Sequence, residues 1–327
     1  MIDQFILDSM HLCFLGVMKK ILDALMSNDL NVKLSQEQRS ELCKKMEIIK
    51  HQQPIEFDRK IRPVSCHLNY KVTDYRFILL FGGPILFKDI LDKNMYKHFL
   101  LLHVACRMLC SKNALNYVDY ARDLLQKFIL ISKELYGPEF VVMNVHSLQH
   151  IPDDVQNMQC NLNYITAFPF EIFLGKIKNT LRSPHNVAPQ LARRMHEKKL
   201  CLNEKPSLPS IEILQQTNGE IKKLKYKQIT ITTKSPDNTV ILNNKNICRI
   251  KKIYVTDGIF KANVDIMKVK DFVYTYPCNS ANVDIYELNP KPASTDKSIL
   301  INTISTKLMI LKPNKENTKV FALELLH

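Results

Sequence analysis

Residues 167–178 read AFPFEIFLGKIK, and this stretch decides how the chain is interpreted. Apolar side chains at positions 170, 173, 174, 177 and 181 have the spacing of one helix face. We therefore predict a helix with a buried apolar stripe. Glu171 lies in the first turn of that helix, beside the apolar face, where a carboxylate without a partner is costly to desolvate.

A run of cations follows Glu171, namely Lys176, Lys178, Arg182, Arg193, Arg194, Lys198 and Lys199. A carboxylate close to many cations suits a phosphodiester site, because the carboxylate can bind a divalent metal ion while the cations neutralise phosphates. The alternative is a first-turn glutamate favoured by the helix dipole, followed by lysines on a solvated face. Taken alone, these residues favour the alternative.

Composition narrows the class of protein. The chain has 327 residues, is 46% apolar and carries a formal charge of +14, which is typical of proteins that bind polyanions such as DNA. It has only 7 glycines and no Gly-rich phosphate loop, so a P-loop or dinucleotide-binding fold is not expected. The 9 cysteines form no CxxC pair, which indicates a reducing, intracellular compartment. We find no secretion signal and no apolar run long enough to span a membrane.

The spacing of apolar residues predicts an α+β protein with two regions. Residues 1–200 are predicted to be mainly helical, with helices over 12–26, 35–50, 74–80, 96–109 and 116–135. We expect Ser35 and Gln38 to form a capping box, and the Gly82-Gly83-Pro84 triplet to end the third of these helices. Residues 201–225 are predicted to be a linker. Residues 226–327 are predicted to form a small β-rich domain, with strands over 228–232, 239–242, 248–254, 272–276, 308–311 and 320–323.

Three further clusters carry reactive side chains. Asp8 and His11 are three residues apart and share one face if helical, although a helix-start Asp with a partly buried His is an equal alternative. His146 and His150 have the i, i+4 spacing of zinc-binding histidines, but two ordinary helix histidines are favoured because no HExxH motif is present. Cys106 and Cys110 lie in an apolar surround, which favours buried free thiols.

Four segments in order resemble one protein family. DSMHL at 8–12 with LGVMKK at 15–20 is similar to the D-x-M-H-x-x-x-x-G segment of CACTA-type and related transposases. The segments 75–84 with 96–104, NVHSLQH at 144–150, and 167–182 resemble the same family in the same order. The resemblance covers roughly residues 1–200. It implies a transposase-derived chain that binds DNA in the nucleus.

The resemblance also implies roles for individual residues. The family has an RNase H-like core with a catalytic triad of two aspartates and one glutamate, and Glu171 matches the glutamate. The two aspartates normally precede the D-x-x-H segment, so this chain is expected to begin after both of them. Residues 12–160 would then be the helical insertion, and residues 167–200 the last acidic helix with its basic run. Asp8 and His11 would be auxiliary residues of the active centre.

The resemblance also implies cofactors and partners. The full-length ancestor would cleave and join DNA strands with two Mg²⁺ ions, which a single glutamate cannot retain. Asp8, His11, His146 and His150 could form a structural Zn²⁺ site, as related recombinases place ligands similarly. Lys176, Lys178, Arg182, Arg193 and Arg194 would contact DNA phosphates without reading bases.

Two functional hypotheses result. The chain is either a transposase fragment that lacks a complete catalytic site or a domesticated, non-catalytic module that binds DNA or protein. A homo-oligomer is possible in both cases. If the parent sheet is missing, the apolar face of the Glu171 helix would need another cover or remain an exposed patch.

Overall fold

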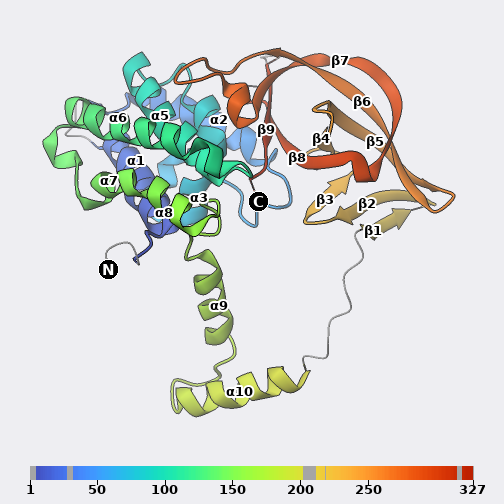
Figure 1. Cartoon of the computed structure of the whole chain (residues 1–327), viewed down its shortest axis with the longest axis horizontal. Helices are drawn as coiled ribbons and strands as arrows, with labels where there is room; N and C mark the ends of the chain where they lie inside the picture. Colours follow the sequence, from blue (N-terminus) through green and yellow to red (C-terminus); the bar gives the residue numbers. More distant parts are fainter. Residues whose placement is uncertain (1–4, 28–31, 202–210, 218, 315–318, 327) are drawn as a thin grey trace.

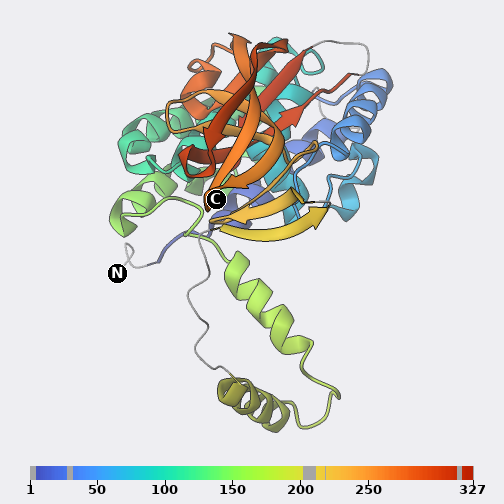
Figure 2. The same ribbon diagram turned by 90° about the vertical axis from the view of Figure 1, so that its right-hand side faces the viewer.

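A computed structural model of the chain describes residues 5–27, 32–201, 211–217, 219–314 and 319–326. A helical region forms one side of the molecule and a β-barrel the other, while two helices, α9 and α10, project away from both (Figures 1 and 2). The expected order of a mainly helical region followed by a β-rich region is therefore confirmed, and the fold is α+β.

The helical region contains helices of three kinds. The α-helices are α1 (Lys19–Met26), α2 (Gln36–Lys50), α3 (Val72–Phe77), α4 (Gly83–Leu86), α5 (Lys93–Cys110), α6 (Val118–Tyr136), α7 (Met143–Ser147), α8 (Ile151–Met158), α9 (Phe168–Lys178) and α10 (Val187–Cys201). Short 3-10 helices are η3 (Val64–Asn69), η5 (Ala114–Tyr117), η6 (Pro138–Phe140) and η7 (Leu148–His150). Two π-helices, η2 (Met10–Met18) and η4 (Ile78–Gly82), are unusual, because this wide helix is rare and often occurs at functional sites.

Most helix predictions agree with the structure. Ser35 and Gln38 form the expected capping box at the start of α2, and Gly137 ends α6 with a φ of 87°. The expected stop at Gly82-Gly83-Pro84 is wrong, since the chain stays helical to Leu86. These glycines serve close packing instead: a Cβ on Gly82 would lie 2.5 Å from the Phe77 ring, and one on Gly83 would lie 2.4 Å from the Phe99 ring.

The β region is a closed antiparallel barrel with a small extension. Its strands are β1 (Ile211–Thr217), β2 (Glu220–Tyr226), β3 (Ile229–Thr232), β4 (Thr239–Leu242), β5 (Ile247–Thr256), β6 (Ile259–Asp271), β7 (Ile285–Leu300), β8 (Ile304–Leu311) and β9 (Val320–Glu324), with short 3-10 helices η8 (Ser280–Val283) and η9 (Ile301–Thr303). Neighbouring strands run in the order β5-β4-β8-β9-β7-β6, and β6 pairs back with β5 to close the barrel. Closure leaves these six strands without a free edge. The strands β1, β2 and β3 extend the sheet from β5 through the pair Ile221–Ile253.

Two β predictions need correction. Strand β1 and all of β2 except Tyr226 lie inside the range 201–225 that we predicted to be a linker, while residues 202–210 and 218 of that range lie outside the described residues. We did not predict β2 as a strand because lysines occupy three of its seven positions. Only Ile221, Leu224 and Tyr226 of this strand face the core. Residues 272–276 are a loop rather than a strand. The backbone of this loop bonds to side chains: Val273 receives a hydrogen bond from Lys88 Nζ at its carbonyl and donates one to Ser280 Oγ.

The two regions share a hydrophobic core. The main cluster of buried side chains extends from the helices into β9 and the loop before η8, including Phe321, Leu323 and Tyr274. Arg107 of α5 is buried at this junction and donates to the carbonyls of Leu80 (2.7 Å), Val283 (3.0 Å) and Glu324 (3.2 Å). A buried guanidinium requires several acceptors, so this residue fixes β9 against α5. None of the described helices is long and apolar enough to cross a membrane.

Candidate functional site

Asp8 physically joins the first and last of the four motif segments. One of its carboxylate oxygens accepts hydrogen bonds from the N–H groups of Met10 (3.0 Å) and Ala167 (2.7 Å). The other accepts the N–H of His11 at 3.2 Å. Because Ala167 is the residue before α9, a single carboxylate caps the start of η2 and holds the start of α9.

His11 lies between Asp8 and Glu171. Its Nδ1 hydrogen-bonds to the Asp8 carboxylate, and its Nε2 lies 3.6 Å from Oε1 of Glu171. Burial of the Asp8 carboxyl acts to raise its pKa, but hydrogen bonds from the His11 side chain and from backbone N–H groups outweigh this effect and lower the pKa. The structure thus brings together the three residues to which the resemblance assigns catalytic or auxiliary roles.

These residues do not fit a two-Mg²⁺ centre. Such a centre needs several carboxylate oxygens that are free to bind metal. Both oxygens of Asp8 accept hydrogen bonds from the protein, which leaves Glu171 as the available carboxylate. Within the part of the chain that the structure describes, no three His, Cys, Asp or Glu side chains are placed to hold a metal ion.

His146 and His150 lie on α7 and η7, with ring centroids 5.9 Å apart. The Gln149 amide lies 3.1 Å from Nε2 of His146, and Nδ1 of His150 lies 4.0 Å from a carboxylate oxygen of Asp153. The structure does not bring these histidines into a ligand group with Asp8 and His11. Zinc binding by the four residues stays a prediction.

The cysteines Cys106 and Cys110 are buried free thiols, as predicted. Burial raises the pKa of Cys110 to about 12. A hydrogen bond with Cys13, together with burial, also raises the pKa of Cys106. Thiols that stay protonated are poor nucleophiles and metal ligands, so this pair belongs to the hydrophobic core.

The predicted DNA-contacting residues lie on the projecting segment 168–201, which we call the arm and which comprises α9, a loop and α10 (Figure 2). Arg193 and Arg194 both pair with Glu197, at 3.2 Å and 2.6 Å. Lys176, Lys178 and Arg182 form no ion pair with any described residue.

The predicted burial of the apolar stripe on α9 is wrong. No residue of α9 is buried, and the exposed fractions are 71% for Phe170, 52% for Phe173 and 62% for Leu174. The helix has the expected apolar spacing, but most of it projects beyond the helical body (Figure 1), and α10 lies beside Phe173 and Ile177 without burying them. A contiguous apolar surface of this kind is typical of an interaction site.

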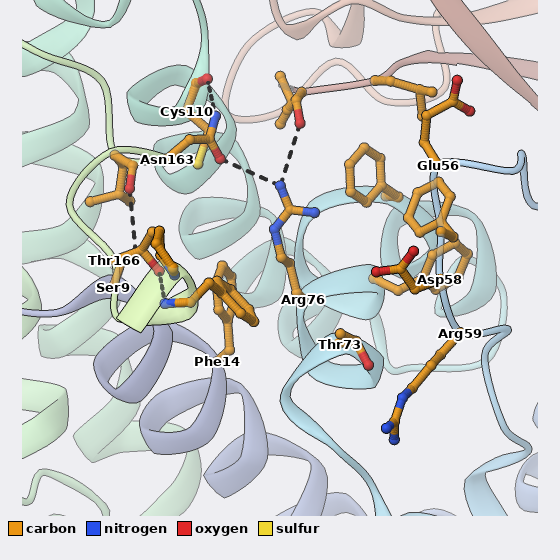
Figure 3. Close-up of a pocket in the computed structure, with 18 of the residues that line it drawn as sticks. Ser9, Phe14, Glu56, Asp58, Arg59, Thr73, Arg76, Cys110, Asn163 and Thr166 are labelled. Atoms are coloured by element: carbon orange, nitrogen blue, oxygen red, sulfur yellow. Dashed lines mark hydrogen bonds between the residues drawn. The ribbon is translucent and has the colours of Figure 1, made fainter. Parts of the chain in front are cut away.

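A pocket at the base of the arm was not predicted from the sequence. Its volume is about 380 Å³, and it is lined by Phe14 of η2, by Arg76 of α3, by Phe168 of α9 and by the C-terminal residues Leu325 and Leu326, among others. Arg76 lies in the middle of the labelled lining residues, with Asn163 on one side (Figure 3). The one sequence signal for this pocket is an arginine inside the apolar run 75–81.

The comparisons with known proteins cover only the β region. Residues 203–325 match a family described as Domain of unknown function (DUF8592). The match is less than half of the chain and encloses all the strands from β1 to β9. No curated protein and no solved structure shows significant similarity to this chain.

Proposed function

We propose that this protein is a DNA-binding protein derived from a transposase, and that the arm contacts the phosphate backbone. The observation that carries the proposal is the charge of the arm. Seven Lys or Arg residues but only two Glu residues lie within 168–201. The arm is free of the helical body along most of its length (Figures 1 and 2), so a duplex could approach these cations.

The distribution of ion pairs supports this proposal. Among the described residues, Arg193 and Arg194 are the arm cations that form an ion pair, and they share the single negative charge of Glu197. The cations without an ion pair to a described residue are Lys176, Lys178, Arg182, Lys198 and Lys199. Lysines and arginines that no carboxylate neutralises are available to displace counterions from DNA, which is the main source of sequence-independent affinity.

The assignment to an RNase H-like transposase lineage is part of the proposal. It is supported by the order of the four motif segments and by the contact of Asp8 with both His11 and the start of the Glu171 helix. In this view, Glu171 descends from the third acid of a catalytic triad. The available carboxylates do not fit two Mg²⁺ ions, so strand cleavage is assigned to the ancestor and DNA binding to this chain.

The experiment measures binding of a fluorescent 20-base-pair duplex over a range of salt concentrations. Neutralising three arm cations (Lys176→Gln, Lys178→Gln and Arg182→Gln) should weaken binding for all duplex sequences. It should also reduce the slope of log K against log salt, by roughly 0.9 for each phosphate contact that is lost.

The matched control removes the same net charge from the β region, through Lys223→Gln, Lys225→Gln and Lys268→Gln. These lysines lie on β2 and β6, outside the arm. We expect the control to bind DNA nearly as well as the unmodified chain. Equal weakening by both triple variants would show that the overall charge, and not the arm, drives binding. Absence of binding at low salt would refute the proposal.

A further inference from the structure

The pocket at the base of the arm contains a guanidinium with few partners. Nη2 of Arg76 lies 3.4 Å from Oδ1 of Asn163 and 3.4 Å from the carbonyl oxygen of Leu326. Both distances are beyond the usual range for an N–H···O hydrogen bond. Nε and Nη1 of Arg76 form no hydrogen bond with any described residue. Nε and Nη1 of Arg76 are therefore unused donors, and Nη2 has only two long contacts.

Other arginines of this chain show how a partly or fully buried guanidinium is normally satisfied. Arg107 donates to three carbonyl oxygens at 2.7–3.2 Å. Arg62 pairs with Asp74 at 2.6 Å, and Arg122 pairs with Asp153 at 2.9 Å. Arg76 has neither close carbonyls nor a carboxylate within the described residues, and its burial lowers its pKa. A charged group with this little compensation calls for an anion from outside.

The neighbouring polar groups leave the charge of Arg76 unneutralised. Glu56 lines the pocket but is committed to Lys307, at 2.7 Å. Asp58 and Arg59 are exposed, and the guanidinium of Arg59 points away from Arg76 (Figure 3). Thr73 lies one helical turn before Arg76 and lines the same pocket, and its buried hydroxyl has no hydrogen-bond partner.

The walls of the pocket are aromatic. Phe14, Phe57, Phe77, Phe81 and Phe168 all line it. The Phe57 ring packs edge-on against Phe77 (5.6 Å between centroids) and against Phe81 (5.2 Å). The Arg76 guanidinium lies 5.7 Å from the Phe81 centroid, which helps to orient its plane. Small-molecule sites typically combine such an apolar wall with one or two polar groups, in volumes of about 300–1,000 Å³.

We propose that this pocket binds a small organic acid, with its carboxylate on the unused donors of Arg76 and its apolar body against the phenylalanine rings. A monoanion is favoured over a phosphate dianion because a single guanidinium neutralises a single charge. A carboxylate also matches the guanidinium fork, because it can accept one hydrogen bond from Nη1 and a parallel one from Nη2, whose two present contacts are long. The site is separate from the DNA-binding surface proposed for the arm, since none of the arm cations lines the pocket.

The test is isothermal titration calorimetry of the full chain with 2-naphthoate. The neutral probe of the same shape is 2-naphthamide. We expect saturable binding of one naphthoate per chain, and at least tenfold weaker binding of the amide, because the amide cannot pair with the guanidinium. Amide binding as tight as naphthoate binding, or no naphthoate binding at millimolar concentration, would overturn the proposal. Tighter binding of 2-naphthyl phosphate would overturn the choice of a monoanion.

Two sets of variants test whether naphthoate binds in this pocket. Arg76→Gln should weaken naphthoate binding by tenfold or more. Because this change could also affect folding, Ile172→Glu and Ile172→Gln provide a second test. Ile172 lines the pocket from α9 and is 56% exposed, so both changes are tolerated by the fold.

We expect Ile172→Glu to weaken naphthoate binding severalfold relative to Ile172→Gln, since only the glutamate repels a carboxylate. Equal affinities of the two variants would contradict the assignment. The control Met195→Gln alters a separate apolar and basic groove between α9 and α10. A loss of binding in this control would place the probe on the arm and refute the pocket.

Discussion

Lys307 on β8 forms a buried ion pair with Glu56, which lies 251 positions away in the sequence. Glu56 belongs to the connector between α2 and η3, residues 51–63. Lys307 Nζ lies 2.7 Å and 3.0 Å from the two carboxylate oxygens of Glu56. It also donates to the Thr230 carbonyl at 2.6 Å and to the Asp237 carboxylate at 2.6 Å. Lys307 is fully buried, so this cluster fastens the connector of the helical region to the barrel.

We predict that Lys307→Met destabilises the protein by about 3–5 kcal/mol in urea unfolding, because the change leaves two nearly buried carboxylates without a cation. The matched control is Lys252→Met, which removes a half-exposed lysine from its pair with Glu220. A surface pair of this kind contributes at most about 1 kcal/mol. Similar losses for the two variants would mean that the buried cluster adds nothing beyond a surface pair.

We predict that Asp8→Ala loosens the attachment of α9. The change removes the acceptor for the N–H groups of both Met10 and Ala167, at a cost of roughly 1–2 kcal/mol in the free energy of unfolding. Amide hydrogen exchange at Ala167 and in the first turn of α9 should become faster. Asp119→Ala serves as the control, since this side chain is 94% exposed. Unchanged exchange at Ala167 would exclude a capping role for Asp8.

We predict that His98 contributes to acid sensitivity. Burial lowers its folded-state pKa from 6.5 to about 4, although a hydrogen bond to the Phe128 carbonyl partly opposes this shift. Below pH 6.5 the unfolded chain binds a proton at this site that the folded chain does not bind. The contribution of His98 to stability is therefore complete above pH 6.5 and declines as the pH falls toward 4, by roughly 3 kcal/mol in total.

The measurement for His98 is a series of urea unfolding curves between pH 7 and pH 4, for the unmodified chain and for His98→Gln. The glutamine keeps a donor for the Phe128 carbonyl but does not titrate. We expect the stability of the variant relative to the unmodified chain to increase as the pH falls. Other titrating groups, including His103 and Glu324, cancel in this difference. Parallel curves for the two proteins would contradict the prediction.

We predict that the 327-residue chain does not nick supercoiled plasmid DNA with Mg²⁺ or Mn²⁺. The reason is that metal binding needs more carboxylate oxygens than Glu171 alone supplies. The neighbouring Asp8 carboxylate already accepts hydrogen bonds from His11 and from backbone N–H groups. Glu171→Gln is the reference protein, and both proteins should give the same background. Nicking by the unmodified chain that is lost in Glu171→Gln would restore the catalytic interpretation.

Local sequence patterns predicted much of the secondary structure. The capping box at Ser35 and the strands over 229–232 and 239–242 follow from side-chain periodicity and turn residues. Failures occurred where packing overrode a local signal. Gly82 and Gly83 looked like a helix end, yet they are interior residues whose missing side chains make room for Phe77 and Phe99.

The candidate site was likewise only partly predictable from the sequence. The sequence by itself determined that Glu171 begins a helix with an apolar face and a basic continuation, since helical spacing and charge are properties of neighbouring residues. Only the tertiary structure decided that this face is exposed, that Asp8 holds its first turn and that Arg76 faces a pocket. Burial, long-range hydrogen bonds and cavities depend on which distant segments pack together, and helical periodicity does not specify the partner of an apolar face.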